Sequence, residues 1–487
     1  MNNLFYELMY EKKTKRIMKI LNVISKHSGL VTINDVVDAL EVSKKTFLSD
    51  FEFLKKTLPK EYVLEERENI ISLTSPSNKP IQDYILELAK SSFIFQLMDN
   101  ILHNRILTIH DAEDAMYISE SSIRKRLAFY NKRLEEFNVS LSTYNINLVG
   151  SEIDIRFFLH SFYTEFRQLV VLDQDLDQHS YNDIYDMIKT KMVAENVPII
   201  NNSYFKMSHW LLIADIRIHA NCFVKIEDQH FKDTIMASDS FKELEAAYSK
   251  VYKNLPSDEV VWILITSLDA VIYDAHEKRL GMYRSDVILN TNEANVYKII
   301  QKVAIPLKLG GDSGFTSVFF SYFKNLAQLT ALSKVYQISS TATIELVKDR
   351  LPTLYKLWEK TLTNMSDELN FKIEFLEDVS ASLALISSQF DYAALNKYNK
   401  IICSFSGEPG LNPYLQTAFK KFVKTGSEVV FLSNIRITSD VIEKEKADLV
   451  VTNFYLSDTT INIPTYRIPY APSRKDWYKL EEFINMK

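Results

Sequence analysis

Cysteine is nearly absent from this sequence, since Cys222 and Cys403 are the only two in 487 residues. Two cysteines so far apart form neither a disulfide framework nor a zinc site, and we expect a cytoplasmic protein. Glycine is also scarce, with nine residues, and the sequence contains no P-loop, no HExxH helix and no GxSxG elbow. We therefore expect no enzyme, no cofactor and no metal site.

Long apolar runs are also missing. None approaches the ~18 residues of a membrane span, and the first residues lack the order of a signal peptide. The first 150 residues have no net charge, with 20 Lys plus Arg against 20 Asp plus Glu, so the net charge of −6 arises after residue 150. A neutral front with locally clustered cations favours sequence-directed binding of nucleic acid over indiscriminate binding.

The front of the chain contains an internal duplication. The stretch 32–54 can be laid over 108–130 without a gap, at an offset of 76 residues. Seven positions are identical, and each copy predicts a helix, a tight turn and a second helix. Thr32 and Thr108 are suited as N-caps, and Asp35 and Asp111 three residues later can complete a capping box.

The second helix of each copy has apolar residues at the spacing of one buried face, which leaves the opposite face for a ligand. That opposite face carries side chains that can donate hydrogen bonds to DNA phosphates and base edges. The candidate DNA-binding residues of the first copy are Ser43, Lys44, Lys45, Thr46, Ser49, Lys55 and Lys56. Those of the second copy are Ser121, Ser122, Arg124, Lys125, Arg126, Lys132 and Arg133.

A short pair of β-prone segments follows each helix pair, at 62–64 with 70–73 and at 139–141 with 146–149. A helix-turn-helix followed by a hairpin is the winged arrangement, in which the second helix enters the major groove of DNA and the hairpin touches the backbone. The alternative is a basic helix surface that binds only water. Because the pattern occurs twice, we favour DNA binding.

The rest of the chain predicts more than one further domain, because single hydrophobic cores stop growing at about 250 to 300 residues. Amphipathic helices run from about 153 to 390, long enough for two bundles. Strands and helices then alternate, which predicts a small parallel sheet. The fold class is multidomain and mainly α, with two winged modules (1–76 and 80–150), two helical domains (151–285 and 286–395) and an α/β domain (398–487).

In this order, the domains resemble the Mga and AtxA type of virulence regulator of Gram-positive bacteria. The stretch NLVGSEIDIRFFLHSFY (147–163) looks like that family's junction between the second winged helix and the first regulatory domain. The resemblance implies two helical phosphotransferase-regulation domains and a C-terminal domain like enzyme IIB of the sugar phosphotransferase system. It also implies phosphorylation of histidines by the phosphocarrier protein of that system.

The histidines follow the family pattern only in part. His209 and His276 are the best candidates for phosphorylation in the first regulatory domain, and the weaker candidates are His160, His179, His219 and His230. Since no histidine follows His276, the second regulatory domain cannot be phosphorylated on histidine.

The C-terminal domain also departs from an enzyme IIB. The strand KIICSFSG places Phe405, and not a cysteine, at the catalytic position, and Cys403 falls inside the apolar run. We expect Cys403 to be a buried core residue and this domain to serve self-association.

The sequence thus predicts a transcriptional regulator that binds double-stranded DNA, forms a homodimer and responds to carbohydrate status through the phosphocarrier protein. Two alternatives stay open: a phosphotransferase-linked antiterminator, and a regulatory scaffold whose winged helices bind protein.

Overall fold

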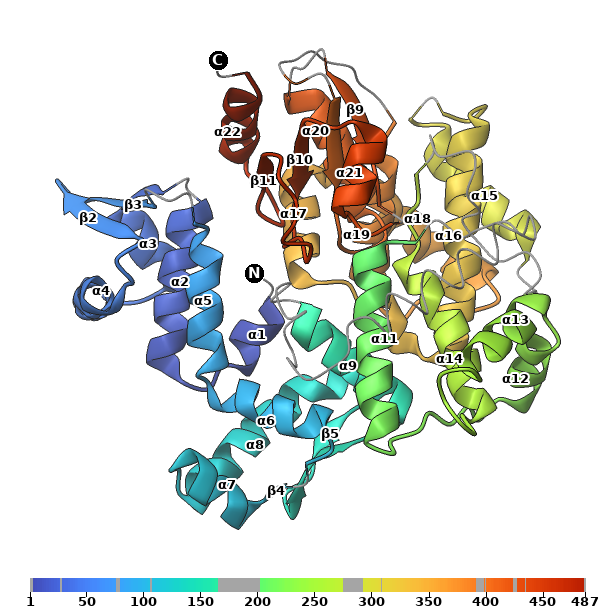
Figure 1. The fold of residues 1–487 in the computed structure, drawn as a ribbon, viewed down its shortest axis with the longest axis horizontal. Helices are drawn as coiled ribbons and strands as arrows, with labels where there is room; N and C mark the ends of the chain where they lie inside the picture. The colour runs from blue at the N-terminus through green and yellow to red at the C-terminus, as the bar shows by residue number, and fades with distance from the viewer. Residues whose placement is uncertain are drawn as a thin grey trace. The chain divides into compact units, whose positions relative to one another are not determined.

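The computed structural model describes residues 3–26, 29–75, 79–105, 107–164, 202–274, 292–307, 309–390, 398, 400–423, 427–433 and 435–485 (Figure 1). The chain divides into two compact units. One comprises residues 1–135, 140–148 and 472–477, and the other comprises residues 136–139, 149–471 and 478–487. The chain is mainly helical, as the sequence predicts.

The first unit opens with helices α1 (Asn3–Leu8) and α2 (Lys12–Lys26). It contains two modules, each with a helix-turn-helix followed by a hairpin of short strands. The first module continues from α2 through β1 (Leu30–Thr32), α3 (Ile33–Leu40), α4 (Lys44–Thr57), β2 (Val63–Arg67) and β3 (Ile70–Thr74). The second module consists of α5 (Ile81–Lys90), α6 (Phe93–Leu102), β4 (Leu107–Thr108), α7 (Ile109–Met116), α8 (Glu120–Leu134), β5 (Ser140–Leu141), β6 (Asn145–Ile146) and β7 (Leu148–Val149). Both predicted pairs of helices are therefore present.

Both modules begin their helix pair with a capping box. The Oγ1 of Thr32 accepts a hydrogen bond from Asp35 N at 3.1 Å, and the Asp35 carboxylate accepts one from Thr32 N at 3.3 Å. Thr108 and Asp111 make the same two bonds at 3.1 and 2.8 Å. The bonds from Thr108 lower the pKa of the Asp111 carboxyl. The predicted capping boxes are confirmed in both copies.

The hairpins of the two modules differ in length. In the first module β1, β3 and β2 form one antiparallel sheet in that order, and the turn at Glu68 and Asn69 joins β2 to β3. Both turn residues have positive φ, as a tight hairpin turn of type I′ requires. In the second module each strand has only two residues, and β4 pairs with β6 while β5 pairs with β7.

The two modules pack together within the first unit. Helix α5 packs against α2, and α1 packs against α8. The Tyr84 hydroxyl donates to the carbonyl of Thr57 at 3.2 Å, and the Tyr62 hydroxyl donates to that of Pro80 at 2.8 Å. Residues 76–78 lie outside the described residues, and these two hydrogen bonds join the modules on either side of them.

The second unit contains the helices that lie between the second module and the C-terminal segment, among the described residues. They are α9 (Glu152–Thr164), α11 (Tyr204–His219), α12 (Gln229–Met236), α13 (Asp239–Tyr248), α14 (Ser257–Thr266), α15 (Glu293–Ala304), α16 (Ser313–Leu332), α17 (Thr341–Arg350), α18 (Pro352–Met365) and α19 (Leu376–Ser387). The boundary predicted between residues 285 and 286 falls in 275–291, outside the described residues.

A buried ion cluster joins three of these helices. The guanidinium of Arg156 on α9 binds both carboxylate oxygens of Glu259 on α14, at 2.7 and 2.9 Å. Both side chains are fully buried. Glu152 on α9 accepts from Arg156 at 3.1 Å and from Arg217 on α11 at 2.8 Å. Arg156 belongs to the stretch that resembles the family junction, and here it holds the packing of α9 together.

The C-terminal segment forms the predicted parallel sheet. Its strands are β8 (Lys400–Ser404), β9 (Glu428–Phe431), β10 (Leu449–Thr452) and β11 (Thr465–Arg467), in the order β11-β10-β8-β9 with all pairs parallel. Helices α20 (Leu411–Phe422), α21 (Ser439–Glu445) and α22 (Arg474–Asn485) alternate with or follow them. Ile442 of α21 packs on Ile402 and Val450 of the sheet.

We expect Asp378 on α19 to make the stability of the second unit depend on pH. Its carboxylate accepts from Ser339 N at 2.9 Å, but burial raises its pKa to about 6. The protonated form is favoured in the folded state, so its contribution to stability is present below about pH 4 and lost as the pH rises through about 6. Asp378→Asn should therefore raise the free energy of unfolding at pH 7 by on the order of 2 kcal/mol and leave it unchanged near pH 4. Urea titrations at both pH values measure the difference, and an equal effect at both would contradict the prediction.

Candidate nucleic-acid interface

Helices α4 and α8 occupy equivalent places in the two modules, and each follows a turn with a left-handed residue. Glu41 has φ 52° and ψ 43°, and Tyr117 has φ 53° and ψ 41°. The matched turns direct the same face of each helix into its core. The buried residues on these faces are Phe47, Phe51 and Leu54 on α4, and Ile123, Leu127, Tyr130 and Leu134 on α8. The opposite faces are free to meet a ligand.

The outward face of α4 carries most of the predicted polar side chains. Thr46 is half-buried, and the exposed ones are Ser43, Lys44, Lys45, Ser49, Lys55 and Lys56. Lys55 is paired with Glu52 at 3.0 Å. The other three lysines make no ion pair with any residue that the structure describes, so their ammonium groups are available to phosphates.

The outward face of α8 is similar in charge. Ser122 is half-buried, and the exposed candidates are Ser121, Arg124, Lys125, Lys132 and Arg133. Arg124 is paired with Glu120 at 2.7 Å, and Arg133 lies 3.8 Å from Glu7. Lys125 and Lys132 have no ion-pair partner within the described ranges. Their ammonium groups are therefore the cations of α8 that can bind phosphate without first leaving an ion pair.

Arg126 does not belong to this surface, which corrects the prediction made for it. Its side chain is only 13% exposed, its guanidinium pairs with Glu11, and it lies over the rings of Tyr10 and Phe93 at 4.9 and 5.1 Å. The offset of 76 residues places Arg126 on Asp50, which is buried and binds Arg16 at 2.6 Å.

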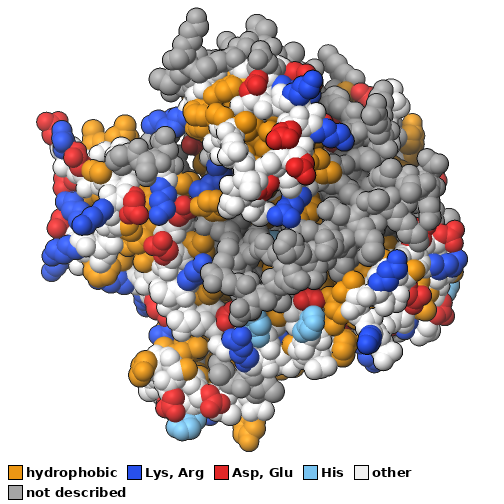
Figure 2. Space-filling view, in the orientation of Figure 1, with side chains coloured by type: hydrophobic (Ala, Val, Ile, Leu, Met, Phe, Trp, Pro, Cys, Tyr) orange, Lys and Arg blue, Asp and Glu red, His pale blue; other side chains and the backbone are white. Residues whose placement is uncertain are grey.

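The two hairpins, or wings, carry different charges. The first wing holds Glu65, Glu66 and Glu68 with a single arginine, Arg67, which is paired with Glu65 at 2.9 Å. Acidic and basic side chains are interspersed over its tip, at the upper left of Figure 2. The second wing, at 142–145, has the sequence STYN and carries no charge. An acidic wing repels phosphates, so only the second wing suits the backbone contact that the sequence predicts for both.

Comparison with known proteins finds similarity over nearly the whole chain. Residues 77–163 match the Mga helix-turn-helix domain. The capsule synthesis positive regulator AcpA of Bacillus anthracis is 19% identical over 494 residues, covering 98% of this chain and all of that protein. The anthrax toxin expression trans-acting positive regulator of the same organism is 19% identical over 97% of this chain and 98% of its own length. The chain is therefore similar, over nearly its whole length, to regulators of the Mga/AtxA type.

The segment that matches the Mga helix-turn-helix domain takes in the whole second module, including α8 and the uncharged wing. A third relative, the capsule synthesis positive regulator AcpB of Bacillus anthracis, is 17% identical over 98% of this chain and 99% of that protein. The similarity therefore extends through both units, while the domain match is confined to the second module and nearly all of α9.

The candidate histidines of this chain differ in exposure. His209 on α11 is buried, 4% exposed, with its ring against Phe205 at 4.4 Å. His160 is also buried and stacks on Trp210. His219 and His230 are exposed, whereas His179 and His276 lie outside the described residues. Among the described candidates, the two accessible histidines are therefore His219 and His230, both of which the sequence ranked below His209.

The carboxyl edge of the parallel sheet is closed by side chains of this chain. Asn453 accepts from Ser406 N and donates to Ser406 O, both at 2.8 Å, between β8 and β10. Phe205 of α11 stacks on Phe454 at 5.1 Å beside them. Cys403 is fully buried in β8, as predicted, and burial raises the pKa of its thiol. These contacts lie at the edge where sheets of this kind hold ligands.

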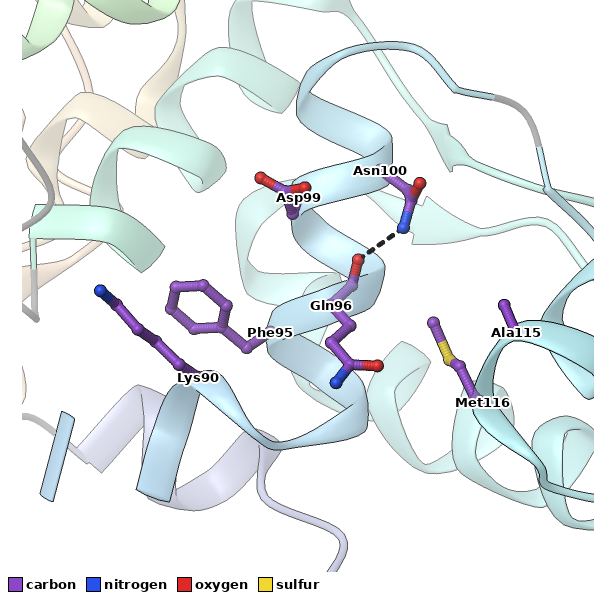
Figure 3. Close-up of a pocket in the computed structure, with 7 residues that line it drawn as sticks. All are labelled: Lys90, Phe95, Gln96, Asp99, Asn100, Ala115 and Met116. Atoms are coloured by element: carbon purple, nitrogen blue, oxygen red, sulfur yellow. Dashed lines mark hydrogen bonds between the residues drawn. The ribbon is translucent and has the colours of Figure 1, made fainter. Parts of the chain in front are cut away.

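The sequence did not indicate a hollow of about 360 Å³ in the second module (Figure 3). It is lined by Lys90, Phe95, Gln96, Asp99, Asn100, Ala115 and Met116. In Figure 3, Met116 and Ala115 of α7 face the side chains of α6, and Asn100 donates to the carbonyl of Gln96 at 2.9 Å. Within the described ranges, no three metal-binding side chains are grouped to hold an ion, and none of the helices could span a membrane.

Proposed function

We propose that this chain is a transcriptional regulator that binds double-stranded DNA through α8 and the wing of its second module. The observation that carries the proposal is the outward row of Arg124, Lys125 and Lys132 on a helix held by a capped helix-turn-helix. A helix of this kind fits the major groove, where its side chains reach phosphates and base edges. The match of residues 77–163 to a helix-turn-helix domain supports the same placement.

The relatives support a direction for the regulation. All three are named positive regulators, two of capsule synthesis and one of anthrax toxin expression. We infer that this chain acts on virulence genes of its own organism. Neither an antiterminator nor a protein-binding scaffold is favoured by the duplicated helix-turn-helix, since both copies direct cations outward from the second helix.

Binding of the purified full chain to a long promoter duplex across a salt series tests the proposal. We expect binding that weakens steeply with salt, with a slope of log K against log salt of about −2.7 or steeper, since three phosphate contacts release counterions at about 0.9 each. Fluorescence anisotropy from 0.05 to 0.4 M salt measures the slope. Weak binding that is insensitive to salt would favour the scaffold.

Carbohydrate control is a further part of the proposal. Phosphoryl transfer needs an accessible, neutral imidazole. The His219 side chain is 68% exposed, and its Nδ1 lies 3.0 Å from the carbonyl oxygen of Asp215, which leaves Nε2 as the nucleophile. His219 therefore suits the phosphocarrier protein better than His209, which would first have to leave its buried position.

Self-association through the C-terminal domain completes the proposal. The sheet ends in two edge strands, β9 and β11, and neither pairs with another strand on its outer side among the described residues. An unpaired edge can extend into the sheet of a second copy, which supports a homodimer. A dimer would carry two copies of α8, and it would contact two half-sites on one duplex.

A further inference from the structure

The two modules share their core and capping boxes but differ on both sides of the second helix. The turn before that helix holds Glu41 in the first module and Tyr117 in the second, with the same backbone angles. The wing after it is acidic in the first module, whereas Tyr144 occupies the wing of the second. Because the backbone is the same in the two turns, the fold itself does not require either side chain there.

Tyr117 and Tyr144 are the most exposed large apolar side chains among the described residues, at 96% and 85%. An exposed tyrosine ring does not contribute the hydrophobic free energy that a buried one would contribute to folding. Tyr117 also sits in a left-handed conformation that glycine or asparagine adopts at lower cost. Neither ring contributes to the packing of the second module.

Both tyrosines are held in fixed places relative to α8. Tyr117 is the C-cap of α7, and only two residues separate it from the start of α8. The wing is clamped to the helix by Asn131, whose amide donates to the carbonyl of Leu141 at 3.0 Å and whose oxygen accepts from Leu141 N. A bond from Ser142 N to the carbonyl of Asn147 at 2.9 Å closes the loop that carries Tyr144. The rings are therefore presented on rigid supports, one before α8 and one in the wing.

We propose that Tyr117 and Tyr144 are uncharged contacts of the second module with double-stranded DNA, on the two sides of the groove that α8 enters. This inference rests on the proposed function. The phenol hydroxyl can bond to a phosphate oxygen, and the ring can pack on sugars and base edges. In the first module, Glu41 and the acidic wing would repel phosphates at the same two places. The second module therefore makes the closer contact with DNA.

The test uses the full chain and a 40-base-pair duplex selected by the wild-type protein from a random-sequence pool. Tyr117→Ala and Tyr144→Ala should each weaken binding about 10-fold, with the salt slope unchanged, because no ion pair with phosphate is lost. Tyr297→Ala is the matched control, since this half-exposed tyrosine lies on α15 of the other unit. It should bind DNA as the wild type does.

The outcomes separate this inference from the function on which it rests. If the wild type shows no salt-dependent binding, both fail. If the wild type binds and the two tyrosine variants bind equally well, this inference alone is wrong. It is also wrong if the variants lose affinity together with part of the salt slope, since the rings would then act by positioning the cations. Unchanged urea unfolding of both variants is expected, because neither ring is packed.

Discussion

Replacing Arg124, Lys125, Lys132 and Arg133 together by alanine is expected to weaken DNA binding by roughly 10²- to 10³-fold at 0.15 M salt. Each lost phosphate contact removes about 0.9 from the salt slope. Since Arg124 and Arg133 have acidic neighbours and the two lysines do not, the slope should fall by between about 1.8 and 3.6. Anisotropy titrations of the full chain across a salt series measure both quantities.

The design leaves Arg126 in place, because its pair with Glu11 stabilises the fold. The matched control replaces four exposed lysines of the second unit: Lys225, Lys242, Lys298 and Lys372. It lowers the net charge equally and should leave the slope near the wild-type value. An equal loss of affinity in both variants would mean that overall charge, and not α8, drives binding.

Replacing Arg156 by alanine is expected to lower the free energy of unfolding of the second unit by about 3 to 5 kcal/mol. The substitution leaves the Glu259 carboxylate buried without its partner, and the remaining bond from Val224 N at 2.7 Å cannot neutralise the charge. The guanidinium also lies over the Trp262 ring at 4.7 Å, so tryptophan fluorescence reports directly on this part of the unit. Urea unfolding followed by fluorescence measures the loss.

The double variant Arg156→Met with Glu259→Gln should recover most of that stability, because it removes both charges and keeps much of the volume. Lys225→Ala is the surface control. Its pair with Glu227 is exposed on both sides, so this change should lie within about 0.5 kcal/mol of the wild type. A loss in Arg156→Ala no larger than in this control would show that the buried cluster contributes little.

The local structure around the candidate site was predictable because it depends on neighbours in the sequence. A capping box needs only Thr32 with Asp35 or Thr108 with Asp111, and the apolar spacing of α4 and α8 is a property of one helix. The parallel sheet was predictable as well, from apolar strands that alternate with helices. Cys403 follows from the same pattern, since it lies inside one such strand.

Partners distant in the sequence were not predictable. Arg126 was taken for a DNA contact because its partner, Glu11, lies 115 residues away. His209 was preferred to His219 because burial depends on which helices cover α11, and no local pattern reports that. Tyr117 and Tyr144 were overlooked, since an aromatic residue is expected in a core unless the fold is known to leave it in water.

The sequence by itself determined the duplicated modules, their helix limits and caps, and the order of helical and α/β segments, because these depend on contacts within a few turns of chain. Only the tertiary structure decided which cations of α8 have no ion-pair partner among the described residues, that Arg126 is paired with Glu11, and that Arg156 is fully buried with Glu259. Burial and charge pairing are properties of surfaces that meet on folding. Residues far apart in the chain supply those surfaces, so spacing alone cannot reveal them.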